Sequence, residues 1–301
     1  MPTAKVILNP YSGRFTGRRR WPEAAEALRA AGVAYELAET ERPGHAEDLA
    51  REAMLAGFAP IVAAGGDGTV GEVVNGLGRA AAAGAPLGPL GIMPVGTAND
   101  IVDTLGIPRD LGAAARVIAA GRARAMDLGE VNGRLFVNNA AVGLEPYVGL
   151  IQRRYKRIQG PPRYMLAALR AIMACPSWTM RLEWDGGRYE GPLSLIAIGN
   201  GPRSGGIFYM APHADMFDGK LHFVYGYRGT RRALLRLLPR TLKPAGRGSY
   251  VEAGRIVETT MTWLRVSIDT PAPAHADGEI FAPEARELEY RIWPGRLHVL
   301  M

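Results

Sequence analysis

The run Ile61-Val62-Ala63-Ala64-Gly65-Gly66-Asp67-Gly68-Thr69 constrains the fold of this chain more than any other segment. An apolar stretch enters a glycine-rich turn, and a helix-like stretch follows. A strand that leads through such a turn into a helix is typical of a phosphate-binding loop, because glycine lets the backbone approach a ligand and the free N–H groups at a helix start favour anions. Asp67 would repel a phosphate unless a cation lay between them. The run therefore indicates a nucleotide triphosphate with a divalent metal, and so phosphoryl transfer.

One alternative for this turn is a dinucleotide site, because Gly66-x-Gly68-x-x-Gly71 has the spacing of the dinucleotide fingerprint. That fingerprint needs an acidic residue about 20 positions later to hold the ribose. Residues 73–99 contain no Asp or Glu, which disfavours a dehydrogenase. The Walker pattern G-x-x-x-x-G-K-[ST] is absent as well. A glycine turn without a ligand is the remaining alternative.

The first 125 or so residues alternate between strand and helix patterns. Strands are expected over 6–9, 33–38, 60–64 and 90–93, and helices over 21–31, 45–56, 69–83 and 111–120. This alternation predicts an α/β doubly wound domain, with ligand loops at the carboxyl ends of the strands.

After residue 125 the pattern changes to strands and hairpins. Asn132-Gly133 is a strong hairpin-turn signal, and Asp185-Gly186-Gly187 is another turn between two apolar runs. Strands are expected over 125–131, 134–140, 178–184, 188–199, 221–226, 247–257, 262–269 and 287–293, and helices over 162–175 and 230–242. We expect a first domain over 1–125, to which about 290–301 can return, and a mainly antiparallel β domain over 126–290.

Two further loops carry polar groups at expected strand ends. Asn9-Pro10-Tyr11-Ser12-Gly13 follows the first strand, and Gly96-Thr97-Ala98-Asn99-Asp100 follows the fourth. Both offer glycine, hydroxyl and amide groups, which suit phosphate contacts. Turn formation and helix capping are the simpler alternatives for these residue types.

Composition and charge restrict the partners. The formal net charge is +7 and comes mostly from arginine, so the surface should attract nucleic acid, anionic lipid or phosphorylated substrates. No helix-turn-helix, zinc or RNA-binding signature is present, which disfavours nucleic acid. The segment 151–157 is basic and also contains apolar residues, so it is a candidate for membrane contact. An ordinary exposed helix face is the alternative.

Cysteine usage and hydropathy bear on location. Cys175 is the only cysteine, so no intrachain disulfide is expected, which is typical of a reducing compartment. No apolar run approaches the roughly 18 residues that span a bilayer, and the N-terminus has no apolar signal core. We therefore expect a cytoplasmic protein, free or held at the inner membrane face.

Taken together, the motifs resemble the diacylglycerol kinase catalytic-domain family, which includes bacterial lipid kinases and the sphingosine and ceramide kinases. The matching residues run along the whole chain: Asn9-Pro10-x-Ser12-Gly13, Gly65-Gly66-Asp67-Gly68-Thr69, Asn75, Gly96-Thr97-x-Asn99-Asp100, Asn139-x-x-x-Gly143, Gly199-Asn200-Gly201, Ser204-Gly205-Gly206, Ala211-Pro212-x-Ala214-Asp215-x-x-Asp218-Gly219-x-Leu221 and Asp277-Gly278-Glu279. The Gly-Gly-Asp-Gly-Thr element alone also occurs in the related NAD kinases.

The resemblance implies an NAD-kinase-like first domain, ATP between the two domains, and a need for Mg2+. It places the nucleotide at Asn9, Pro10, Tyr11, Ser12, Gly13, Thr40, Gly65, Gly66, Asp67, Gly68, Thr69, Gly71, Asn75, Thr97 and Asn99. It also implies a magnesium site around Asp215, Asp218 and Lys220 that orders the active site, partly through backbone carbonyls.

The resemblance places the catalytic base in Asp277-Gly278-Glu279, where both carboxylates are candidates, and Asp67 would organise the metal and phosphates. His275 precedes this element. If a strand continues through it, His275, Asp277 and Glu279 share one face. A plain turn is the alternative for Asp277-Gly278.

The sequence thus predicts an ATP- and magnesium-dependent lipid kinase acting on a hydroxyl of a lipid such as diacylglycerol at a membrane surface. The resemblance also suggests a homodimer. The alternatives are a kinase of a non-lipid alcohol, such as NAD or a natural product, and a nucleotide-binding regulator without catalysis.

Overall fold

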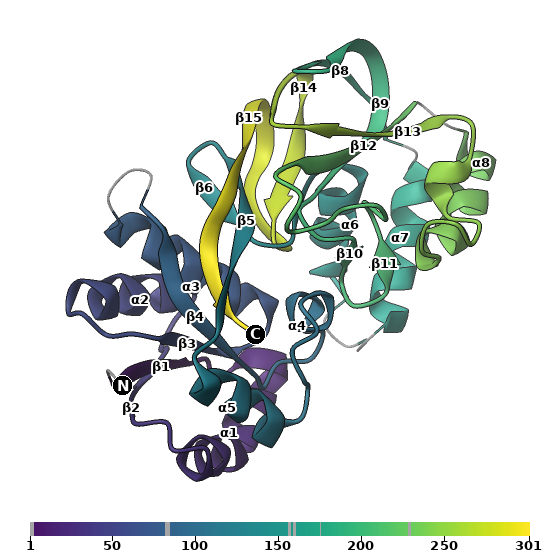
Figure 1. Ribbon diagram of the computed structural model, residues 1–301. Coiled ribbons are helices and arrows are strands. Elements are labelled where there is room, and N and C mark those ends of the chain that lie inside the picture. Colours follow the sequence, from purple (N-terminus) through teal and green to yellow (C-terminus); the bar gives the residue numbers. More distant parts are fainter. Residues whose placement is uncertain (1–2, 82–84, 156–157, 159–160, 175, 228–229) are drawn as a thin grey trace.

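A computed structural model describes residues 3–81, 85–155, 158, 161–174, 176–227 and 230–301 (Figure 1). Cys175, and Lys156 and Arg157 of the predicted basic segment, lie outside the described residues. The chain forms an N-terminal α/β part and a C-terminal part of curved antiparallel strands. The predicted fold class is confirmed.

The N-terminal part is built on four parallel strands. These are β1 (Ala4–Leu8), β2 (Tyr35–Glu39), β3 (Ile61–Gly65) and β4 (Leu87–Pro94), in the spatial order β2-β1-β3-β4. Every residue of β3 is buried, as expected for a strand covered by helices on both sheet faces. The strand order reverses between β1 and β3, and ligands of doubly wound sheets bind at that point.

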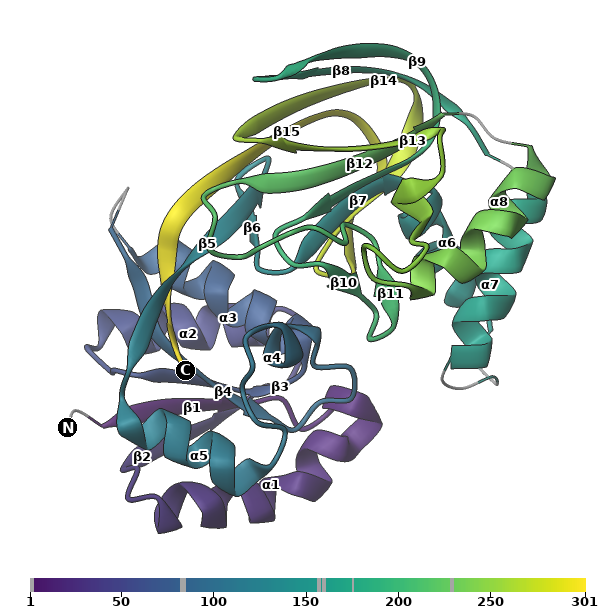
Figure 2. The same ribbon diagram turned by 45° about the vertical axis from the view of Figure 1, so that its right-hand side comes forward.

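Two pairs of helices cover this sheet (Figure 2). The helices α1 (Ser12–Ala30) and α5 (Leu111–Ala120) lie on one face and α2 (His45–Leu55) and α3 (Asp67–Ala80) on the other. The start predicted for α1, at Trp21, is wrong. The helix begins at Ser12, and Gly17 in its second turn lies against the Asn9 carbonyl, which a Cβ would meet at 2.3 Å. The short helix α4 (Asp100–Thr104) was not predicted.

The C-terminal part is a strongly curved antiparallel sheet with helices at one end. Its strands are β5 (Ala123–Val131), β6 (Arg134–Phe136), β7 (Asn139–Gly143), β8 (Trp178–Trp184), β9 (Gly187–Gly199), β12 (Leu221–Tyr227), β13 (Ile256–Met261), β14 (Trp263–Ala276) and β15 (Glu279–Leu300), beside the separate pair β10 (Arg203–Ser204) and β11 (Phe208–Tyr209). Its helices are α6 (Leu144–Gln152), α7 (Pro161–Ala174) and α8 (Arg231–Leu237), with the 3-10 helices η1 (Leu238–Leu242) and η2 (Tyr250–Glu252).

The long strand β15 joins the two parts. It pairs antiparallel with β14 and β5 in the C-terminal part, and its last residues, Leu297 and Val299, pair in parallel with Leu87 and Leu90 of β4. The two halves therefore share one continuous sheet, and the C-terminus lies against the N-terminal strands (Figure 2). The boundary at residue 125 stays a prediction, since β5 runs across it.

Two of the predicted elements are divided in the structure. The strand predicted over 134–140 splits into β6 and β7, because the N–H groups of Val137 and Asn138 donate to the side chain of Asp277, in the turn between β14 and β15. The strand predicted over 247–257 is largely η2 and turns, since Gly246 and Gly248 have φ of +75° and +83°. By contrast, Asn132 and Gly133 form the expected hairpin turn, with φ of +47° and +83°.

Asn200 provides a test of how these strands are held. Its side chain is completely buried, and Nδ2 donates to the carbonyls of Asp127 at 2.9 Å and Val137 at 2.7 Å. We expect Asn200→Ala to lower the free energy of unfolding by about 2–4 kcal/mol, because two buried carbonyls lose their donor. Urea unfolding measures this loss, and a loss below about 0.5 kcal/mol would contradict this role for Asn200.

Candidate active site

Three loops meet where β1, β3 and β4 end. A Cβ on Gly96 would lie 2.4 Å from the Cα of Gly66, and a Cβ on Gly13 would lie 2.5 Å from the Thr97 hydroxyl oxygen. Only glycine permits these approaches. The residues predicted from the three motifs are thus brought together at the switch point of the sheet.

The start of α3 is suited to an anion. Gly66 precedes the helix and supplies no side-chain cap, and a Cβ on Gly68 would meet no other atom within 4 Å. Asn9 Nδ2 donates to Thr69 Oγ1 at 3.1 Å, which ties the first loop to the helix. The first N–H groups of α3 therefore border open space and carry the positive end of the helix dipole.

The other predicted nucleotide residues occupy different positions around these loops. Ser12 Oγ is buried and has no hydrogen-bond partner among the described residues, Tyr11 is exposed, and Thr40 is buried at the end of β2. Asn99 has φ +54° and donates from Nδ2 to the Gly96 carbonyl at 3.2 Å. Asn75 lies farther along α3 and exchanges hydrogen bonds with the backbone of Leu135, so it links α3 to β6.

A cavity of about 1000 Å³ separates the glycine loops from the C-terminal part. This volume is at the upper end of the range for ligand sites. Both halves contribute to its wall: Gly13, Asp67, Thr97, Asp100 and Arg109 on one side, and Asn139, Glu145, Ser204, Gly206, His275 and Asp277 on the other. The site is therefore incomplete in either half alone.

Two carboxylates face this cavity from the N-terminal part. Asp67 Oδ1 accepts the N–H of Ile101 at 3.0 Å, and Asp100 Oδ2 accepts the N–H of Gly206 at 2.8 Å. Burial raises the pKa of Asp100, and the charge of Asp67 raises it further, against the effect of the Gly206 N–H. Asp100 belongs to a motif that the sequence singled out, yet no role was predicted for it. Its position as the first residue of a helix after a glycine turn was the available signal.

Asp277 is held in the cavity wall by backbone donors. Its carboxylate accepts the N–H groups of Val137 at 2.8 Å, Asn138 at 2.9 Å and Asn139 at 3.1 Å. Burial raises the pKa of Asp277, while the three N–H groups lower it and the charge of Asp67 raises it. Gly71 lets α3 approach, since a Cβ there would lie 3.2 Å from Asp277 Oδ2.

Asp277 and Gly278 are also the two central residues of a hairpin turn between β14 and β15, with φ of +47° and +78°. The turn interrupts strand alternation, so the expectation that His275, Asp277 and Glu279 share one face is wrong. Glu279 forms an ion pair with Arg134 at 2.6 Å, is half exposed, and lines a narrow cleft beside α3, not the large cavity. Of the two candidate bases, the structure brings only Asp277 to the cavity.

A buried His–Glu pair was not found from the sequence. His275 Nε2 lies 3.3 Å from Glu145 Oε1, which also accepts the hydroxyl of Ser204 at 2.8 Å. The Gly278 N–H donates to His275 Nδ1 at 3.3 Å, so Nε2 carries the proton in this arrangement. Glu145 Oε2 is buried, and no residue that the structure describes forms a hydrogen bond with it. No motif of charged residues at fixed spacing marks this pair, because β14 and α6 meet only in the fold.

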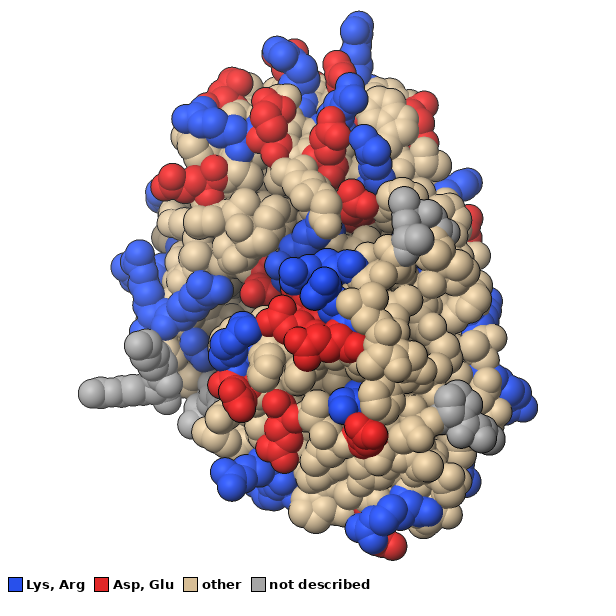
Figure 3. All heavy atoms as spheres, turned by 90° about the vertical axis from the view of Figure 1, so that its left-hand side faces the viewer, with Lys and Arg blue, Asp and Glu red and all other residues tan. Residues whose placement is uncertain are grey.

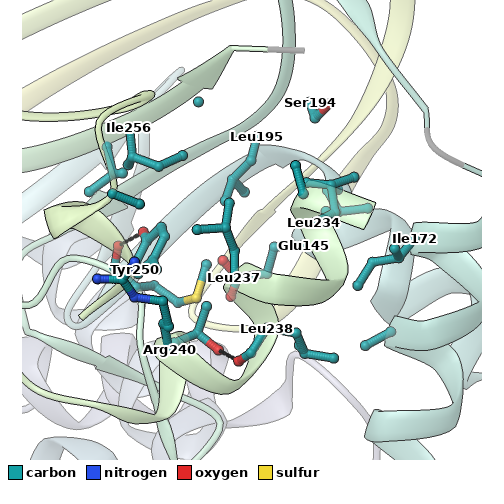
Figure 4. A pocket seen from close by; sticks show the side chains of 18 of the residues that line it. Glu145, Ile172, Ser194, Leu195, Leu234, Leu237, Leu238, Arg240, Tyr250 and Ile256 are labelled. Atoms are coloured by element: carbon teal, nitrogen blue, oxygen red, sulfur yellow. Dashed lines mark hydrogen bonds between the residues drawn. The ribbon is translucent and has the colours of Figure 1, made fainter. Parts of the chain in front are cut away.

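Glu145 also lines a second cavity of about 370 Å³ that is almost wholly apolar (Figure 4). Figure 4 shows leucine and isoleucine side chains around it, with Tyr250 and Arg240 at one side. Its wall includes Leu144, Val148, Tyr164, Ile172, Leu195, Phe208, Leu234, Leu237, Leu238 and Ile256. Tyr164 and Phe208 also line both cavities, so the larger and the smaller cavity adjoin at Glu145.

In the loop that was predicted to bind magnesium, Asp215 and Asp218 hydrogen-bond to backbone N–H groups of the same loop. Asp215 Oδ1 accepts the Phe217 N–H at 3.0 Å, and Asp218 Oδ1 accepts the Lys220 N–H at 2.9 Å. Within the described ranges, no three His, Cys, Asp or Glu side chains lie close enough to hold a metal ion. The metal site at Asp215, Asp218 and Lys220 stays a prediction that depends on backbone carbonyls.

One face of the molecule does not gather its positive charge in one place. On the face seen in Figure 3, basic and acidic side chains are interspersed. Among the helices of the described chain, none is long and apolar enough to cross a membrane.

Asp100 and Asp103 allow a pH test of these assignments. The folded state favours protonated Asp100, so its contribution to stability falls as the pH rises from the unfolded-state pKa through the folded-state pKa. Arg109 lowers the pKa of Asp103, so Asp103 stabilises above the ordinary pKa of aspartate and loses this effect in acid. At pH 7 we expect Asp100→Asn to raise and Asp103→Asn to lower the free energy of unfolding, measured in urea. Shifts of the same sign would contradict the assignment.

Family models and curated relatives both relate this chain to diacylglycerol kinases. A model of the diacylglycerol kinase catalytic domain matches residues 3–131, and a model described as the YegS C-terminal NAD kinase beta sandwich-like domain matches residues 138–301. The chain is 32% identical over 284 residues to a diacylglycerol kinase of Bacillus subtilis, covering 93% of this chain and 90% of the relative. A Staphylococcus aureus diacylglycerol kinase is 31% identical over 278 residues, covering 92% and 85%.

Solved structures agree on the fold. A crystal structure of a diacylglycerol kinase from Bacillus anthracis superimposes with a TM-score of 0.75 at 21% identity, covering 99% of this chain and 96% of that one. A yeast NADH kinase complexed with NADH superimposes with a TM-score of 0.52 at 12% identity, covering 99% and 83%. The matched domains and the sequence identity together show that this chain is a kinase and belongs to the diacylglycerol kinase family.

Proposed function

We propose that this protein transfers the γ-phosphoryl group of ATP to a hydroxyl group of a lipid, and that the reaction needs Mg2+. The observation that carries the proposal is the junction at Glu145. There the larger cavity, which begins at the start of α3 and has three aspartates in its wall, adjoins a smaller apolar cavity. A lipid acceptor needs both environments, since its chain is apolar and its reacting hydroxyl must meet the phosphate.

The three glycine loops fit a nucleotide triphosphate. The start of α3 offers open space at Gly68, and among the described residues Ser12 Oγ and Asn99 Oδ1 are buried polar atoms that have no hydrogen-bond partner. Asp67 and Asp100 fit a role beside Mg2+, because hard carboxylate oxygens suit that ion. Bound Mg2+ would neutralise negative charge on the phosphates, which would otherwise face the carboxylates of Asp67, Asp100 and Asp277.

The apolar cavity fits one lipid chain. A cavity of about 150 Å³ takes one benzene ring, so 370 Å³ holds on the order of 15 carbon atoms. The relatives named diacylglycerol kinase make a glycerolipid such as diacylglycerol the first acceptor to test. A chain in this cavity would leave its polar end at Glu145, on the side of the larger cavity.

We assign the base to Asp277 and not to Glu279. A raised pKa brings a carboxylate closer to neutral pH, where it accepts a proton more effectively from a hydroxyl group. Three backbone N–H groups fix its orientation, whereas Glu279 is neutralised by Arg134 outside the cavity.

Asp277→Asn against Glu279→Gln tests this choice. We expect Asp277→Asn to reduce kcat by about 10²–10⁴-fold, the usual contribution of a positioned base, and Glu279→Gln to change it less than about tenfold. The measurement is steady-state transfer with folding checked by circular dichroism. The reverse ranking would assign the base to Glu279.

Gly96→Ala tests the nucleotide loops. The added methyl group would collide with the Gly66 backbone, so the loops must separate and we expect ATP affinity to fall at least tenfold in calorimetric titration. Gly112→Ala in α5 is the control, because its Cβ would meet its nearest atom at 3.4 Å. Equal ATP affinity in both variants would contradict the proposed nucleotide site.

The deciding experiment measures magnesium-dependent transfer of radiolabelled γ-phosphate from ATP into lipids in mixed micelles, with NAD and water as control acceptors. Label in a lipid supports the proposal and identifies the acceptor. Label in NAD alone would assign the non-lipid activity that the yeast NADH kinase fold allows. If the protein binds ATP but transfers no phosphate, a nucleotide-binding regulator without catalysis is the remaining interpretation.

A further inference from the structure

We propose that the end of the molecule built by α7 and α8 docks on an anionic lipid bilayer and holds the apolar cavity beside it. The two helices lie side by side, away from the N-terminal sheet, in both ribbon views (Figures 1 and 2). This docking rests on the proposed function, because it would bring the lipid acceptor of that reaction close to the cavity. Binding itself needs no nucleotide, so it is measured separately from transfer.

The outward side of α7 is an apolar stripe. Leu166, Leu169 and Met173 are spaced three and four apart and therefore share one helix face, where they are 39%, 39% and 53% exposed. The opposite face, with Ala167 and Ala171, is buried against α6. A helix that is apolar on both sides normally has neighbours on both, and within the described chain nothing covers the outer stripe.

The neighbouring α8 and η1 add exposed leucines and arginines. Leu235 is 38% and Leu242 is 40% exposed, and Arg231 and Arg232 are both exposed. Within the described residues, the guanidinium groups of Arg231 and Arg232 have no carboxylate at ion-pair distance, and the same holds for Arg170 of α7.

Two long segments that build this end of the molecule carry basic residues and no acidic ones. Residues 146–182 and 219–251 contain no Asp or Glu, although both are rich in arginine. The first acidic residue after the second stretch is Glu252, which accepts the Gly246 N–H. Basic residues interleaved with exposed leucines are typical of surfaces that bind anionic membranes.

The same elements form the wall of the apolar cavity on their inner side. Ile172 of α7, Leu234 and Leu237 of α8, and Leu238 and Arg240 of η1 line it (Figure 4). A bilayer that contacts the outer side would therefore lie one helix away from the cavity. A lipid chain would then reach Glu145 with little exposure to water.

Charge favours a bilayer over a second copy of the chain. A two-fold interface places the same surface on both partners, so two acid-free arginine-rich faces would repel. A nucleic acid would complement the arginines and leave the leucine stripe without a partner. An anionic bilayer complements both.

The test is cosedimentation of the full chain, without ATP, with vesicles of phosphatidylcholine alone or mixed equally with phosphatidylglycerol. We expect binding to the mixed vesicles only. Leu169→Glu with Met173→Glu should weaken it at least tenfold, because apolar contact is lost and like charge is added. Arg231→Gln with Arg232→Gln should weaken it about thirtyfold.

Matched controls come from the other end of the molecule. Leu55→Glu removes a leucine that is 61% exposed on α2, and Arg51→Gln with Arg116→Gln removes two exposed charges from α2 and α5. These variants should bind as the wild type does. Circular dichroism confirms that each variant is folded.

Four results would overturn the proposal. Three concern vesicle binding: no binding by the wild type, equal losses of binding in the control variants, or binding that Leu169→Glu with Met173→Glu leaves intact. The fourth is a dimer, seen in light scattering, that those two substitutions dissociate. Full vesicle binding without lipid phosphorylation would contradict the proposed function and not the docking surface. Lipid phosphorylation in micelles without vesicle binding would contradict the docking surface alone.

Discussion

The hydrogen bonds of β15 determine how the two halves of this kinase face each other. The strand begins beside Asp277 in the cavity wall and ends in parallel pairing with β4. The chain of β4 then turns into the Gly96 loop on the opposite wall. Both walls of the cavity are thus fixed to one strand, and their separation follows from its length and curvature. The large cavity is a property of the sheet as much as of the loops.

A second constraint is the concentration of carboxylates in that cavity. Asp67, Asp100 and Asp277 lie close enough for the charge of Asp67 to raise the pKa of each of the other two. Backbone N–H groups satisfy them in part. Negative charge in this cavity disfavours a bare phosphate, which supports the proposed requirement for Mg2+.

The fold class and the meeting of the glycine loops were accessible from the sequence, because parallel strands that alternate with helices bring their carboxyl ends to one edge of the sheet. The helix of α5 and the hairpin at Asn132-Gly133 were also predicted correctly, since each is defined by local residue preferences. The choice between Asp277 and Glu279 was not accessible. It depends on a turn that directs Asp277 toward the N–H groups of 137–139, and those groups come from a distant segment. The pairing of His275 with Glu145 has the same origin.

The parallel pairing of β4 with the end of β15 also bears on the independence of the halves. The second neighbour of β4 is supplied by Leu297 and Val299, far later in the sequence, so the N-terminal sheet is complete only after that segment has been synthesised. Until then β4 is an open edge, rich in apolar residues, of the kind that recruits foreign strands. The two halves are therefore interdependent folding partners and not modules that evolution could exchange freely, even though the family models divide the sequence between them.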